Sequence, residues 1–145
     1  MKMQNPAALA MGDILRAWTP FDDKPNVAGP KFRPVIFLGE TVINDVTHWV
    51  VAYGTTRMQA CKESKSGTDF IVRCMNDRSM VMNSDTRFDF SKLFAIPATT
   101  EFFSANKRST LARIAKIPEQ DLPQAAACMQ AAKVGQALSR LGVRL

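Results

Sequence analysis

The chain has 145 residues, 46% of them hydrophobic and 22% charged, so we expect one domain, residues 1–145, with a substantial core. Its net charge of +6 favours a polyanionic partner such as nucleic acid and fits an acidic protein partner equally well. The three cysteines, Cys61, Cys74 and Cys128, have no paired spacing, which argues against a disulfide framework or a zinc site. No apolar stretch is long enough for a membrane span and the run Ala7 to Met11 is too short for an export signal, so we expect a cytoplasmic protein.

The first predicted strand runs from Gly12 to Trp18, where a turn pair precedes apolar residues and Thr19-Pro20 follows. The next segment, Phe21 to Pro30, is rich in proline and charge, which is typical of an irregular loop. It leads into Val35 to Leu38, a continuous apolar run that predicts a strand buried on both faces.

Arg33 stands at the start of this strand and is followed by Pro34. A proline disfavours helix at the residue before it, so Arg33 is held extended and its guanidinium points in a fixed direction. A fixed guanidinium fork suits a phosphate, and Lys31 places a second cation beside it. The alternative is an ordinary strand start in which Arg33 pairs with a surface carboxylate.

Further short strands are predicted where β-branched and aromatic residues gather or alternate: Thr47 to Tyr53, Asp69 to Cys74, Thr86 to Phe90 and Lys92 to Pro97. The first should form a hairpin with the Arg33 strand. Phe102 and Phe103 are expected to close the core, and the alanine-rich residues 119–141 predict a C-terminal helix. Together these elements predict a mainly β fold: a small, strongly curved barrel over residues 12–103 with one helix packed on it.

Several chemistries lack the residues that they need. The lone histidine, His48, lies within a predicted strand, no glycine-rich phosphate loop is present, and the spacing of the carboxylates gives no metal site. We therefore expect neither a metal nor another cofactor. What remains is Arg33 and the turn Gly54-Thr55-Thr56, which the hairpin should bring together. Arginine can stabilise charge on a phosphorane and a threonine hydroxyl can bond its oxygens, while RNA can supply its own 2′-hydroxyl as nucleophile.

At these residues the chain resembles the MazF/PemK family, the toxins of type II toxin–antitoxin systems, which are small Src-homology-3-like β-barrels. The likeness covers most of the chain between residues 12 and 122 in the same order. Its pieces are Gly12 to Ile14, Pro30 to Gly39, Val51 to Thr56, Asp69 to Val72, Thr86 to Phe90, Ile96-Pro97, Glu101 to Phe103 and Ile114 to Leu122.

The resemblance implies a metal-independent endoribonuclease that inhibits growth by cutting single-stranded mRNA. Arg33 and Thr55 match the catalytic arginine and threonine of the family. Cleavage would leave a 2′,3′-cyclic phosphate and a 5′-hydroxyl. The resemblance further implies a homodimer, an antitoxin protein as partner, and gating of the RNA groove by the loop Phe21 to Lys31.

The expected RNA-binding residues are Lys31, Phe32, Thr56, Arg57 and Arg87. The family usually has serine where this chain has Thr56, and Arg57 follows it as a bulky cation. Each of these residues also has an ordinary alternative, because threonines often cap turns and lone cations are usually solvated. For the whole chain the alternative is a non-catalytic barrel module that binds nucleic acid or an acidic protein.

Overall fold

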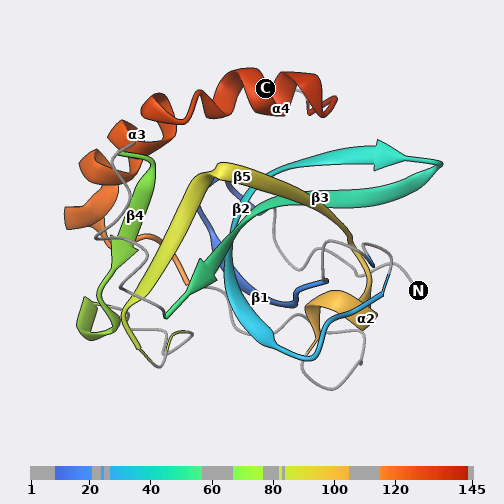
Figure 1. Cartoon of the computed structure of the whole chain (residues 1–145), viewed down its shortest axis with the longest axis horizontal. Coiled ribbons are helices and arrows are strands. Elements are labelled where there is room, and N and C mark those ends of the chain that lie inside the picture. The colour runs from blue at the N-terminus through green and yellow to red at the C-terminus, as the bar shows by residue number, and fades with distance from the viewer. Residues whose placement is uncertain are drawn as a thin grey trace.

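A five-stranded antiparallel sheet with the strand order β1-β2-β3-β5-β4 forms the centre of the protein (Figure 1). Its strands are Ile14–Trp18 (β1), Phe32–Ile43 (β2), Val46–Thr55 (β3), Asp69–Val72 (β4) and Thr86–Pro97 (β5). The structure, a computed structural model, describes residues 9–20, 24, 27–56, 67–76, 82, 84–104 and 115–143. The predicted mainly β fold with a helical C-terminus is confirmed.

The edges of the sheet differ from the prediction of a closed barrel. In the described residues β1 pairs with β2 and makes one isolated bridge from Ile14 to Ala115, while β4 pairs with β5. The two edge strands are short and do not meet each other, so the sheet is open and barrel closure is not confirmed. The two strands predicted between Thr86 and Pro97 are one strand, because pairing with β3 continues on both sides of a bulge at Ala52 and Gly54.

The predicted hairpin is formed by β2 and β3, which are joined by Asn44 and Asp45. Both turn residues have positive φ, 51° and 65°, which is the backbone of a type I′ turn and matches the right-handed twist of the strands. The run Val35 to Leu38 lies in the middle of β2 and is buried on both faces, as predicted.

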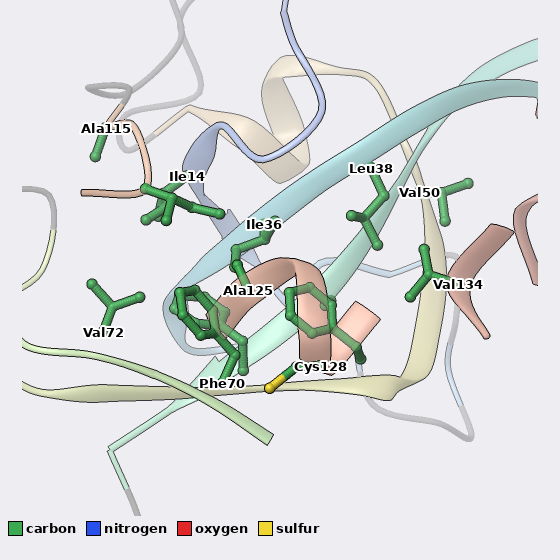
Figure 2. Close-up of a cluster of buried hydrophobic side chains, with 14 of the residues drawn as sticks. Ile14, Ile36, Leu38, Val50, Phe70, Val72, Ala115, Ala125, Cys128 and Val134 are labelled. Carbon is green, nitrogen blue, oxygen red and sulfur yellow. The ribbon is translucent and has the colours of Figure 1, made fainter. Parts of the chain in front are cut away.

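The two faces of the sheet carry separate apolar clusters, because successive strand residues point to opposite sides. On one face Ile36 and Leu38 pack with residues of the C-terminal helices, among them Cys128 (Figure 2). On the other face the cluster includes Phe102 and Phe103 from the short helix α2 (Thr100–Phe103). The prediction that these two phenylalanines are buried in the core is thus confirmed.

The prediction of one C-terminal helix is wrong. The segment forms a 3₁₀ turn η2 (Glu119–Asp121) followed by the helices α3 (Leu122–Ala131) and α4 (Val134–Arg140). The break lies at Lys133, which has the left-handed φ of 55°. In an unbroken helix the nine steps from Ala125 to Val134, at about 100° each, would put these two side chains on opposite sides. The break lets Ala125 and Val134 both reach the core.

Another 3₁₀ turn, η1 (Cys74–Asn76), follows β4 where the predicted strand extended to Cys74. Figure 1 shows α3 beside β4, with α4 continuing along the same side of the molecule. No helix within the described ranges has the length and hydropathy needed to cross a membrane.

Candidate functional site: a cationic pocket at the strand ends

The sheet register brings the two predicted catalytic residues together. Val35 of β2 pairs with Tyr53 of β3, and continuing this antiparallel register by two residues sets Arg33 opposite Thr55. On the other side Thr55 pairs with Arg87 of β5. Residues directly opposite each other share a face, so Arg33, Thr55 and Arg87 form a row across three strands.

Gly54 lets the strands approach closely at this level. A Cβ atom on Gly54 would lie 2.6 Å from Cγ2 of Thr86, 2.8 Å from Cε1 of Phe88 and 2.8 Å from the carbonyl oxygen of Pro34. Real Cβ atoms do not come so near, and the Pro34 oxygen belongs to the backbone of β2. The absence of a side chain at position 54 therefore keeps β2, β3 and β5 together beside Thr55.

A pocket of about 260 Å³ opens at this end of the strands, and we call it the strand-end pocket. Its lining includes three cations, Arg16, Lys31 and Arg33, and three threonines, Thr55, Thr56 and Thr86; Phe32, Pro34 and Gly54 complete it. Four of the predicted site residues besides Arg33 are thus lining residues: Lys31, Phe32, Thr55 and Thr56. Arg16 and Thr86 were not predicted.

The charge of the strand-end pocket is uncompensated within the described part of the chain. The ion pairs found there are Arg73 with Asp85, Arg87 with Asp69 and Lys116 with Asp13, and none involves a cation of the pocket. The described lining residues include neither a carboxylate nor a histidine. The pocket can therefore donate hydrogen bonds and positive charge to an anion.

Arg16 and Phe32 form one wall of the pocket as a unit. Nη2 of Arg16 donates a hydrogen bond to the carbonyl oxygen of Phe32, 2.5 Å away, and its Cζ lies over the Phe32 ring, 4.9 Å from the centroid. The same ring packs against the indole of Trp18 with centroids 4.8 Å apart. Phe32, one of the predicted RNA-binding residues, thus already contacts two side chains of its own protein.

The other two predicted RNA-binding residues are Arg87 and Arg57. Arg87 is not among the lining residues, and its Nη1 lies 2.6 Å from Oδ1 of Asp69, with side chains only 15% and 10% exposed. This ion pair gives Arg87 a structural partner, whereas RNA binding by Arg87 stays a prediction. Arg57 lies outside the described residues, as do residues 21–23, 25 and 26 of the predicted gating loop from Phe21 to Lys31.

His48 and the carboxylates stand apart from this chemistry. His48 is buried in β3, and its Nδ1 lies 2.8 Å from the carbonyl oxygen of Val46, near the hairpin turn. Within the described ranges, no three side chains of His, Cys, Asp or Glu are grouped as metal ligands would be. The chemistry available in the strand-end pocket is thus that of guanidinium, ammonium and hydroxyl groups.

Compared with known proteins, the chain matches no family model and no curated protein. The inference of function therefore depends on the residues and geometry of the strand-end pocket.

Proposed function

We propose that this protein is a MazF/PemK-like endoribonuclease that cuts single-stranded RNA in the strand-end pocket without a metal ion. One observation supports the proposal above all. Arg33 and Thr55, which the resemblance assigns to catalysis, lie at adjoining ends of the paired strands β2 and β3 and line one pocket whose described cations have no acidic partner.

In the proposed reaction the 2′-hydroxyl oxygen of the substrate attacks the adjacent phosphorus, and the bond from phosphorus to the 5′ oxygen breaks. The products are a 2′,3′-cyclic phosphate and a 5′-hydroxyl. Arg33 stabilises the charge that develops on the non-bridging oxygens, and Thr55 donates a hydrogen bond to one of them. An arginine keeps its proton, so the 2′-hydroxyl proton passes to water and the leaving oxygen takes a proton from water.

The remaining parts of the proposal concern architecture and partners. We propose that the fold is a Src-homology-3-like barrel and that two copies form a homodimer. An antitoxin protein is the proposed inhibitor. An acidic antitoxin segment would complement the cationic pocket and compete with RNA for it.

A second candidate is a nucleic-acid-binding module without catalysis. The observation in its favour is that the described lining residues include no carboxylate or histidine to serve as a general base. Such a module would use the same cations to bind phosphates and would leave the RNA intact.

The test is incubation of purified protein with a long single-stranded RNA in excess EDTA, followed by mapping of the fragment ends. Wild type is compared with Arg33→Ala and Thr55→Val, and Arg73→Ala is the matched control because Arg73 is exposed and pairs with Asp85 outside the pocket. Cleavage at discrete sites with 5′-hydroxyl ends, lost in both pocket variants and kept in the control, is the expected result. RNA that is bound but left intact by folded wild type would refute the nuclease and favour the binding module.

A further inference from the structure

Arg16 of β1 places a second guanidinium in the strand-end pocket, beside that of Arg33. The proposed reaction assigns no role to Arg16. No motif marks it in the sequence, where it stands between Leu15 and Ala17 in the first strand. Its position and its contacts give it a distinct part in recognising the substrate.

The guanidinium of Arg16 is held in place before any ligand arrives. One of its nitrogens donates to the Phe32 carbonyl, and its Cζ lies over the Phe32 ring, which packs against Trp18 in turn. A cation over an aromatic face is attracted by the ring quadrupole. An arginine fixed in this way loses little conformational entropy when it binds, which favours affinity.

The hydrogen-bonding capacity of Arg16 is not exhausted by these contacts. A guanidinium has five N–H groups. Nε of Arg16 is buried and finds no acceptor among the described residues, and no described carboxylate pairs with the charge. Arg73, Arg87 and Lys116 each have such a carboxylate, so Arg16 differs from them in offering its charge to a ligand.

Arg16 and Arg33 reach the pocket from opposite faces of the sheet. Ala17 of β1 pairs with Arg33 of β2, so these two residues share a face, and Arg16 pairs with Pro34 on the other face. Both arginines nevertheless line the same pocket. Two guanidinium groups that approach from different sides are suited to two different anionic groups.

We propose that Arg16 binds the phosphate next to the scissile one on the same RNA strand, so that the pocket recognises two consecutive phosphodiesters. This inference rests on the proposed function, which assigns the scissile phosphate to Arg33. It names the substrate as an oligonucleotide with a flanking phosphate rather than a dinucleotide with a single phosphodiester.

The test measures binding of a short single-stranded RNA whose cleavage position carries a 2′-deoxy nucleotide, so that the strand stays intact. Fluorescence anisotropy gives Kd as a function of KCl for wild type, Arg16→Met and the matched control Arg73→Met, which removes the same charge outside the pocket. Losing one phosphate contact should reduce the slope of log K against log salt by about 0.7 in Arg16→Met. The slope of Arg73→Met should equal that of wild type.

A second arm replaces single phosphates of the RNA by uncharged methylphosphonates. In wild type, neutralising the phosphate beside the cleavage position should weaken binding about tenfold, the effect of losing about 1.4 kcal/mol. The same replacement should have no further effect in Arg16→Met, whereas neutralising the scissile phosphate should still weaken that variant. Circular dichroism checks that Arg16→Met is folded. Arg16→Lys keeps the positive charge but lacks the planar guanidinium, so its RNA affinity should lie between those of Arg16→Met and wild type.

The possible results distinguish failure of this inference from failure of the proposed nuclease function. If Arg16→Met and the neighbouring methylphosphonate weaken binding independently, so that their fold-changes in Kd multiply, the inference is wrong while the nuclease proposal stands. The same holds if Arg16→Met removes the effect of neutralising the scissile phosphate instead. If wild type binds no RNA at all, the proposed function fails and this inference fails with it.

Discussion

Gly54 is the residue at which a single added methyl group should disturb the site most directly. Substitution by alanine places Cβ less than 3 Å from Thr86 Cγ2, Phe88 Cε1 and the Pro34 carbonyl oxygen. All three neighbours are confined, because Thr86 and Phe88 are buried and the Pro34 oxygen is part of the β2 backbone. The strands must therefore move apart to accommodate Gly54→Ala.

The magnitude follows from two opposing effects. Overpacking of a close contact costs about 1–3 kcal/mol, and replacing glycine stabilises by about 0.4–1 kcal/mol because the unfolded chain has fewer conformations. The midpoints of these two ranges leave a net loss of about 1.3 kcal/mol. For a chain of 145 residues, 1 kcal/mol corresponds to about 3 °C in Tm, so Gly54→Ala should melt about 4 °C below wild type.

The assay is thermal and urea unfolding followed by circular dichroism, with Gly135→Ala as the matched control. Gly135 lies in α4, and a Cβ there would meet nothing within 4 Å. The same substitution should stabilise the protein there, by about 0.5–1 kcal/mol, through helix propensity. If Gly54→Ala is as stable as wild type, the close approach of the three strands at this point is wrong.

Other predictions concern the turn, a buried ion pair and a buried thiol. Asp45→Gly should raise stability by about 0.5 kcal/mol in urea unfolding, because glycine adopts the positive φ of the type I′ turn without strain. Arg87→Met should lower stability by about 3 kcal/mol, because it leaves the Asp69 carboxylate buried without its partner, and adding Asp69→Asn should restore most of the loss. Burial raises the pKa of Cys128 above its ordinary 9.0, so native protein should resist iodoacetamide at this residue. Since the unfolded thiol then ionises first, the contribution of Cys128 to stability should decline as pH rises above 9.0, which a Cys128→Ala comparison can measure.

The parts of the fold that were predictable from sequence are those with a strong local pattern. The apolar run Val35 to Leu38 and the β-branched run after Thr47 predicted the hairpin of β2 and β3. Its register brings the ends of the two strands that carry Arg33 and Thr55 close together. The break at Lys133 was not predicted because alanine can lie on the buried or the exposed face of a helix. The apolar pattern around it therefore does not show where one buried face ends and the next begins.

The missed site residues depend on pairings between strands that are distant in sequence. Arg16 reaches the pocket because β1 pairs with β2 in one particular register, and Thr86 because β5 pairs with β3 across a bulge. Neither pairing has a local signal, since a shift of one residue would turn either side chain to the opposite face. The ion pair of Arg87 with Asp69 was not predicted for the same reason, because Asp69 lies on β4 and Arg87 on β5.

The cations of the strand-end pocket should cost the fold stability, because like charges gathered without acidic partners repel one another. Replacing Arg33 by glutamine, which keeps much of the side chain, should therefore raise stability slightly, by about 0.5 kcal/mol at low salt. The gain should shrink as salt rises above about 0.1 M, where the screening length falls below about 10 Å. Urea unfolding at two salt concentrations measures this, with Arg73→Gln as control, which loses an ion pair and should gain nothing. An Arg33→Gln variant less stable than wild type at low salt would mean that Arg33 holds the fold together, and the argument that its charge is kept for a ligand would fail.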